Sequence, residues 1–125
     1  MEKLKFDVCV IGCGPAGFAA AMRSYDFDNH VCIVEGNHVG GAGIADGALS
    51  SKTMWELAKD YSIANRVDRG YRASSISVDY EKVRDNVFSA VREKEYQIRS
   101  QIETFSKKEV TSKSLTLFEG WGKFS

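Results

Sequence analysis

The chain has 125 residues, of which 43% are hydrophobic and 27% are charged, so a packed core is expected and a disordered chain is disfavoured. Lys and Arg together number 17, as do Asp and Glu, and this balance disfavours a basic surface for nucleic acid or anionic lipid. No apolar run approaches the roughly 18 residues of a membrane-spanning helix, and Val8–Ile11 is too short for a secretory signal. We therefore expect a cytoplasmic protein, one domain or part of a larger one, with neither nucleic acid nor membrane as a partner.

The first third of the chain predicts a strand, a helix and a second strand. Residues 6–11 predict a strand, and because residues 8–11 are apolar in succession, both of its faces are expected to be buried. A helix is predicted over residues 15–27, because Pro15 suits a first helical turn, where its missing N–H has no partner. The helix should end at residues 28–29, where Asn29 tolerates a left-handed conformation. Residues 31–35 predict a second buried strand, which completes a βαβ unit with parallel strands.

The remaining two thirds predict helices and one short strand. A glycine-rich loop is expected at residues 36–47, a helix at about 48–65, a turn at Gly70, and a long helix capped by Asp79 that reaches about residue 107. Lys94 and Glu95 interrupt an apolar stripe on this long helix, and either the chain itself or a partner subunit could cover the stripe. A strand over residues 114–119 follows. The stripe consists of Val83, Val87, Val91, Ile98, Ile102 and Phe105.

Three cysteines, Cys9, Cys13 and Cys32, lie in the first third of the chain. An odd number without a CxxC spacing argues against a disulfide framework and against a zinc site. Cys9 and Cys32 lie inside apolar runs, where a thiol usually serves as a small hydrophobic side chain. The sequence therefore predicts buried, inert thiols.

A glycine motif follows the first predicted strand and opens the first predicted helix. It reads GCGPAG over residues 12–17, and its position inside a βαβ unit is typical of dinucleotide binding. Gly12 would permit the tight turn off the strand, Gly14 would let a pyrophosphate approach the backbone, and Gly17 would let the helix pack close to the strand. The helix N-terminus would offer free N–H groups to the pyrophosphate.

Glu35 ends the second predicted strand, 23 residues after Gly12, where a ribose-binding carboxylate is expected. A carboxylate there would repel an adenosine 2′-phosphate, so a ligand of the NADP type is disfavoured at this site. The plain structural alternative is a glycine-rich turn beside an exposed Glu35. At this point the residues leave FAD and NAD open as ligands.

Beyond Glu35 the chain resembles the pyridine nucleotide-disulfide oxidoreductases, the family of dihydrolipoamide dehydrogenase and the soluble transhydrogenase. Residues 40–52 read GGAGIADGALSSK, where the family segment reads GGTCxNxGCxPSK. Residues 119–124, EGWGKF, are similar to the family's short strand beside the adenine. The resemblance covers essentially the whole chain and is specific in the first 52 residues and at residues 119–124. It implies an α/β fold: a Rossmann-like βαβ FAD-binding half-domain with a parallel sheet and a long flanking helix.

The resemblance also implies roles for particular residues. The glycine motif would wrap the FAD pyrophosphate, Glu35 would bind the adenosine ribose, and Gly41 with Ala42 would follow the phosphate and ribityl chain. Lys52 would lie near the isoalloxazine ring, and Gly122 would contact adenine through its backbone. No catalytic residue and no metal ligand is predicted. The candidate cofactor-binding residues are Gly12, Gly14, Pro15, Ala16, Gly17, Glu35, Gly36, Gly41, Ala42, Lys52 and Gly122.

The sequence departs from the family at the two redox-active cysteines, which align with Gly43 and Ala48. Thiol–disulfide exchange needs those sulfurs, and the chain's own three cysteines lie on the strand and phosphate-loop side. Ala42 and Ser50 also replace the family's threonine and proline. Reduction of lipoamide or glutathione disulfide by the usual route is therefore not expected, although hydride transfer belongs to the flavin.

Family members are several times longer than this chain. We therefore predict that residues 1–125 are the N-terminal part of an FAD-binding domain, a fragment without the NAD(P)-binding and dimerisation domains. The full-length protein is expected to be a homodimer that uses NAD(P)H and an electron acceptor that the sequence does not identify. The alternative is a non-catalytic dinucleotide-binding or scaffolding module. An NAD-binding domain of a dehydrogenase is a weaker option, which residues 40–52 disfavour.

Overall fold

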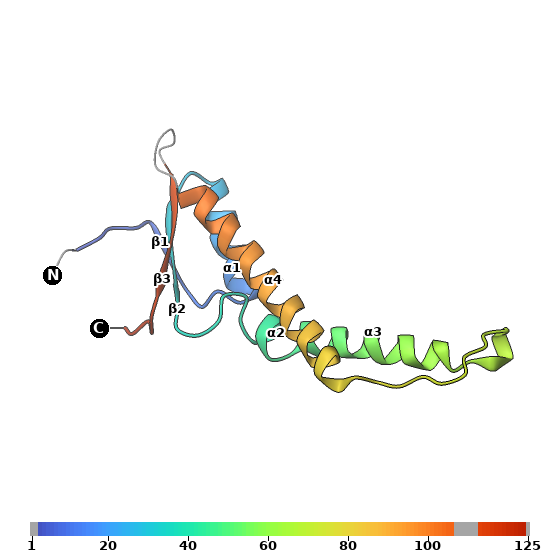
Figure 1. Ribbon diagram of the computed structural model, residues 1–125. Helices are drawn as coiled ribbons and strands as arrows, with labels where there is room; N and C mark the ends of the chain where they lie inside the picture. Colours follow the sequence, from blue (N-terminus) through green and yellow to red (C-terminus); the bar gives the residue numbers. More distant parts are fainter. Residues whose placement is uncertain (1–2, 107–112, 125) are drawn as a thin grey trace.

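A three-stranded parallel sheet lies at one side of the molecule, and the helices lie on one face of it (Figure 1). The computed structural model describes residues 3–106 and 113–124. The strands β1 (Val8–Ile11), β2 (His30–Glu35) and β3 (Ser114–Glu119) lie in the order β1-β2-β3. Helix α1 (Pro15–Asp26) joins β1 to β2, so the predicted βαβ unit is confirmed.

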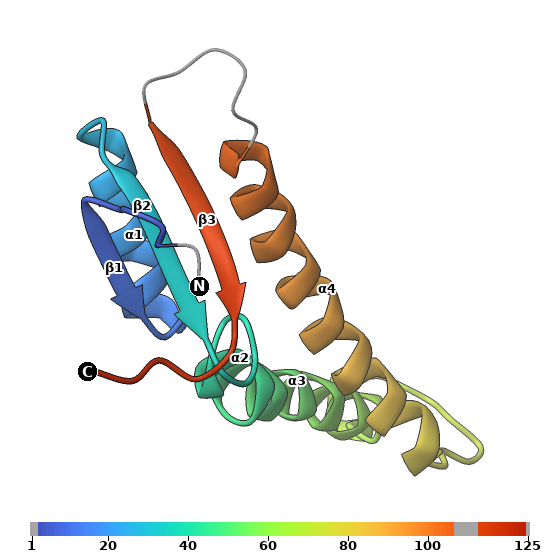
Figure 2. The ribbon, with the colours of Figure 1, turned by 90° about the vertical axis from the view of Figure 1, so that its left-hand side faces the viewer.

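The middle of the chain is helical and extends away from the sheet (Figure 1). A single helical turn, α2 (Ala42–Ala45), precedes α3 (Ala48–Ala64), and a short 3-10 helix, η1 (Val67–Arg69), follows. Helix α4 (Tyr80–Ser106) begins beside the middle of α3 and runs back along β3 (Figure 2). The predicted fold class, a parallel α/β unit with a long flanking helix, is confirmed. The sequence predicted loop where α2 forms, because four residues are too short to show a helical period.

The core lies between the sheet and the two helices that cover it, α1 and α4 (Figure 1). On the strands, Val31 pairs with Leu115, and both of these residues and Ile33 are fully buried. Ala21 of α1 is fully buried against them. On α4, Ile98 and Ile102 complete this core on the helix side of the sheet. The buried core consists of Cys13, Ala21, Val31, Ile33, Val39, Ile98, Ile102 and Leu115.

The prediction that both faces of the first strand are buried is wrong. Val8 and Val10 pack on the core, whereas Cys9 is exposed and Ile11 is 52% exposed. Successive side chains of a strand point to opposite faces, and within the described chain α1 and α4 lie on one side of the sheet only (Figure 1). The other side, which we call the open face, carries the side chains of Cys9, Ile11 and Phe118, and Phe6 meets Phe118 edge to face there.

The apolar stripe of α4 packs within the chain. Val87, Ile98 and Ile102 are buried, and the other three members of the stripe are partly buried. The predicted Asp79 cap is confirmed, because its Oδ1 accepts a hydrogen bond from the Lys82 N–H at 3.2 Å. The predicted end of this helix, at residue 107, lies outside the described residues.

The end of α1 differs by one residue from the prediction. Asp28 takes the left-handed conformation, with φ of 62°, while the side chain of Asn29 donates a hydrogen bond to the Ser24 carbonyl at 3.0 Å. Both residue types tolerate positive φ, so composition alone does not decide between neighbours.

Among the described residues, the helices are all too short or too polar to span a bilayer.

Candidate functional site

The turn from β1 into α1 has the geometry that the glycine motif predicts. The Gly12 N–H donates to the Val34 carbonyl at 2.8 Å, which extends the β1–β2 pairing, and Gly12 then takes φ of 95° to leave the strand. A Cβ on Gly17 would lie 2.0 Å from the Gly12 carbonyl oxygen, so only glycine allows α1 to sit this close to β1. The structural tasks assigned to Gly12 and Gly17 are therefore confirmed.

The start of α1 is open toward the carboxyl edge of the sheet. A Cβ placed on Gly14 would meet no atom within 4 Å, and Gly14 caps the helix without any side-chain hydrogen bond. Pro15 occupies the first helical position and carries no N–H. The N–H groups of the first turn, at Ala16 and Gly17, therefore lack helix partners and suit an anion.

A second glycine turn packs directly on the first. The Gly40 N–H donates to the Cys13 carbonyl at 2.8 Å, and a Cβ on Gly41 would come within 2.9 Å of the Gly14 Cα. Gly41 has φ of 64°, which favours glycine, and Ala42 begins α2 immediately afterwards. The fold thus brings residues 12–17 and 40–42 together, as the sequence predicted.

Glu35 fastens the end of β2 to the glycine motif. Its Oε2 accepts a hydrogen bond from the Cys13 N–H at 2.6 Å, and its Oε1 accepts one from the Asn37 N–H at 2.8 Å. Each carboxylate oxygen has a further lone pair, and the residue is only partly buried. A hydroxyl pair of a bound sugar could therefore reach the same carboxylate. Sequence reasoning missed these backbone partners, because they depend on the register between β1 and β2.

The chain after β3 returns to the same edge of the sheet. The Gly120 N–H donates to the Glu35 carbonyl oxygen at 2.8 Å, and Gly122 lies over Ile11. Trp121 packs on Gly36 so closely that a Cβ on Gly36 would lie 2.7 Å from the indole, yet the tryptophan is 86% exposed. The sequence did not predict this contact, since it joins residues that are far apart in the chain.

Lys52 stands apart from these turns. It is exposed on the second turn of α3, and its side chain takes part in none of the hydrogen bonds or ion pairs among the described residues. The predicted proximity of Lys52 to a flavin ring stays a prediction. By contrast, Lys94 of α4, which the sequence showed only as an interruption of the stripe, lines a pocket of about 320 Å³ with Gly14 and Pro15.

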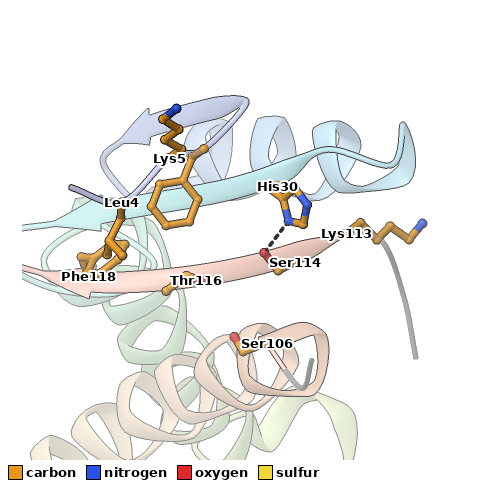
Figure 3. A pocket seen from close by; sticks show the side chains of 9 residues that line it. Leu4, Lys5, His30, Ser106, Lys113, Ser114, Thr116 and Phe118 are labelled. Atoms are coloured by element: carbon orange, nitrogen blue, oxygen red, sulfur yellow. Dashed lines mark hydrogen bonds between the residues drawn. The ribbon is translucent and has the colours of Figure 1, made fainter. Parts of the chain in front are cut away.

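A larger hollow of about 600 Å³ lies at the edge of the open face, away from the glycine turns (Figure 3). His30 and Ser114 face each other across β2 and β3 there, with 3.1 Å between Nδ1 and Oγ. None of the candidate cofactor-binding residues lines this hollow. It is lined by Leu4, Lys5, Phe6, His30, Ser106, Lys113, Ser114, Thr116 and Phe118.

The cysteines do not all match their prediction. Cys13 and Cys32 are buried, as expected, but Cys9 is exposed, because it points to the open face. Burial is the main cause that raises the pKa of the Cys13 thiol above its ordinary value. Burial and a hydrogen bond with the Cys9 thiol raise the pKa of Cys32 to about 11. Both buried thiols therefore stay protonated at neutral pH.

Comparison with known proteins places these features in a family context. The family described as "Pyridine nucleotide-disulphide oxidoreductase" matches residues 6–120. A dihydrolipoyl dehydrogenase of Geobacillus stearothermophilus is 29% identical over 90 residues, which are 71% of this chain and 19% of that protein. One of Bacillus subtilis is 32% identical over 83 residues, which are 66% of this chain and 18% of that protein. The chain thus spans about a fifth of the length of these relatives.

A solved structure shows the same fold. The HOCl-induced flavoprotein disulfide reductase RclA from Escherichia coli superposes with a TM-score of 0.75 at 16% sequence identity. The match covers 98% of this chain and 23% of that protein. At this identity the likeness concerns the fold, and it confirms the parallel α/β arrangement with its long helix.

Proposed function

Because the chain belongs to the pyridine nucleotide-disulphide oxidoreductase family, we propose that it is the N-terminal FAD-binding part of a flavin-dependent NAD(P)H oxidoreductase. The observation that carries this proposal is the assembly of two glycine turns and the Glu35 carboxylate at one edge of the sheet. Open α/β sheets bind ligands at the carboxyl ends of their strands. Residues 1–125 would form only part of the FAD site, and the rest would come from other segments.

The described residues fit the adenosine diphosphate half of FAD. The open space at Gly14 and the unpartnered N–H groups of Ala16 and Gly17 suit the pyrophosphate, which needs donors and positive potential. The Glu35 carboxylate, held by the Cys13 and Asn37 N–H groups, can accept the hydroxyls of the adenosine ribose. Gly36 and Gly122 would flank the adenine, and Gly41 with Ala42 would follow the chain toward the flavin.

The proposed chemistry is hydride transfer without a redox disulfide. Bound FAD would supply the hydride-accepting ring, and the protein would bind and orient it. Gly43 and Ala48 stand at the positions where the family resemblance puts the two cysteines, and all three cysteines of the chain precede residue 33. Lys52 would lie near the isoalloxazine and stabilise negative charge on the reduced ring. The proposed acceptor of the electrons is therefore a quinone, a second nicotinamide, a metal ion or oxygen rather than a disulfide.

Titration with FAD of the flavin-free protein that carries this segment at its full length, followed by flavin fluorescence, tests the binding proposal. Removing the ribose acceptor in Glu35→Ala should weaken FAD binding about tenfold or more, because hydrogen bonds to a charged group contribute about 1.5–3 kcal/mol. The matched control is Glu103→Ala, at an exposed glutamate of α4 that does not line the pocket beside Gly14 and Pro15. Absence of FAD binding, or equal binding by the wild type and Glu35→Ala, would overturn the proposal.

A second measurement separates an oxidoreductase from a non-catalytic binding module. The full-length protein that carries this segment is loaded with FAD, NADH or NADPH is added, and the loss of flavin absorbance is measured. Bleaching supports the oxidoreductase. A stable flavin colour with either nucleotide indicates a binding module. The same preparation would show whether the protein is the homodimer that we propose.

A further inference from the structure

Two of the three cysteines stand directly opposite each other in the sheet. Cys9 of β1 pairs in register with Cys32 of β2, and the neighbouring pairs are Val8 with Val31 and Val10 with Ile33. Because Val8 and Val31 belong to the core side, Cys9 and Cys32 both point to the open face. The same offset of 23 residues that places Glu35 next to the glycine motif therefore also aligns these two thiols.

The thiols are close enough to interact but poorly placed for a disulfide. The direct pairing of Cys9 with Cys32 in adjacent strands places the two side chains next to each other on the open face. Neighbouring strands lie about 4.8 Å apart, and side chains that stand perpendicular to the sheet keep about that spacing between their Cβ atoms. A disulfide prefers a Cβ separation of about 3.5–4.5 Å. A bridging ion is less demanding, since two bonds of about 2.3 Å at a tetrahedral angle span sulfurs about 3.8 Å apart.

Access to this pair is from one side. Cys9 is exposed, and Cys32 is 4% exposed beside it, so an ion would meet Cys9 first and close onto Cys32. Cys13, the third cysteine, is fully buried and belongs to the core on the helix side of the sheet. It offers an internal comparison, because its thiol has no cysteine partner.

We propose that Cys9 and Cys32 form a two-thiolate binding site for soft, thiophilic cations on the open face of the sheet. This site is separate from the proposed FAD site and does not depend on it. A divalent ion would displace both thiol protons to solvent and form two metal–sulfur bonds, with no change in oxidation state. Soft ions favour thiolate ligands, and they bind by deprotonating a thiol even where its free pKa is high.

The site differs from a structural zinc site in the number of its ligands. Over residues 3–106 and 113–124, no group of three or more His, Cys, Asp or Glu side chains is placed to hold a metal ion. Structural zinc sites use four protein ligands. Water or a small thiol would fill the other positions here. Because the two protein ligands are thiolates, binding should favour Cd²⁺ over Mg²⁺ or Ca²⁺, which need oxygen ligands.

The test uses the full 125-residue chain, reduced and free of metal. Cd²⁺ titration is followed by the near-ultraviolet absorbance of cadmium thiolates, and one equivalent should saturate it. Cys9→Ser, a change at an exposed position, should weaken Cd²⁺ binding at least tenfold, while Cys13→Ala should leave it unchanged. Circular dichroism checks that each variant is folded. Equal Cd²⁺ affinity in wild type and Cys9→Ser would overturn the proposal.

Phenylarsine oxide provides a second readout that requires two neighbouring thiols. It condenses with both sulfurs and releases one water, so intact-mass analysis should show one phenylarsenic group on wild type and on Cys13→Ala. Neither Cys9→Ser nor Cys32→Ser should keep this adduct after washing. No adduct on folded wild type, or an adduct that survives in Cys9→Ser, would show that the two thiols do not act together.

Discussion

The Oε2 atom of Glu35 lies 2.6 Å from the backbone nitrogen of Cys13, so the carboxylate at the end of β2 holds the middle of the glycine motif. This contact connects the two halves of the dinucleotide-binding signature before any ligand is present. Because the Asn37 N–H holds the other oxygen, the carboxylate is fixed in position at its site. The hydroxyls of a bound ribose would therefore meet a carboxylate that is already oriented to accept their hydrogen bonds, which lowers the entropic cost of binding.

The charge of Glu35 should exclude a 2′-phosphate. We expect ADP-ribose to bind the wild-type chain more tightly than 2′-phospho-ADP-ribose, because the carboxylate repels the phosphate at short range. In Glu35→Gln this preference should shrink, and the wild-type preference should weaken with salt. Isothermal titration with both ligands measures the ratio, and Glu103→Gln is the matched control. An unchanged ratio in Glu35→Gln would contradict the role of the charge.

Gly17 should be essential for stability. In Gly17→Ala the new Cβ would lie 2.0 Å from the Gly12 carbonyl oxygen, a backbone atom that cannot move without shifting β1 or α1. Overpacking of this kind costs about 1–3 kcal/mol or more. Urea unfolding, followed by circular dichroism, should show a lower midpoint. If the urea midpoint of Gly17→Ala equalled that of the wild type, α1 would be free to move away from β1.

Gly14 should instead matter for binding alone. A Cβ at this position meets no atom within 4 Å and φ is −72°, so Gly14→Ala should lose less than about 1 kcal/mol of stability. The added methyl group would occupy the space proposed for the pyrophosphate, and FAD affinity should fall more than tenfold. Comparing Gly14→Ala with Gly17→Ala separates the two effects. Full FAD affinity in Gly14→Ala would place the pyrophosphate elsewhere.

Trp121 should report on the terminal segment. In Gly36→Ala the new Cβ would come within 2.7 Å of the indole, and because Trp121 is 86% exposed the ring should swing away at little cost. In a Trp55→Phe background, the emission of Trp121 should shift. The free energy of unfolding should stay within about 0.5 kcal/mol of its value without Gly36→Ala. Gly122→Ala, whose Cβ makes only ordinary contact with Ile11, is the control and should leave the emission unchanged.

Stability should fall at alkaline pH because of Cys32. Its pKa is about 11 in the folded chain, against an ordinary value of 9.0, so the unfolded chain releases this proton first. Between pH 9 and 11 the folded state binds more protons, and the free energy of unfolding therefore decreases as pH rises. Thermal unfolding across this range should show a steeper decline in wild type than in Cys32→Val. Equal slopes would contradict the raised pKa.

Local patterns in the sequence were sufficient to predict most of the elements. The apolar runs at residues 8–11 and 31–35, the glycines at 12, 14 and 17, and Pro15 at the start of a helix determine the βαβ unit, because each acts on the backbone near it. The Asp79 cap is local in the same way. The short helix α2 escaped prediction because four residues are too short to show a helical period. The left-handed residue is Asp28 rather than Asn29, because both residue types tolerate positive φ.

What the sequence determined by itself is the family, the order of strands and helices, and the residue types at the glycine turns. Only the tertiary structure decided which strand faces are covered: α1 and α4 lie on one side of the sheet, and Cys9 and Ile11 face the other. Only the register between strands brought Cys9 to Cys32 and the Glu35 carboxylate to the Cys13 N–H. Such contacts depend on how separate segments align in space, because hydrogen-bond geometry, rather than any one residue, sets that alignment.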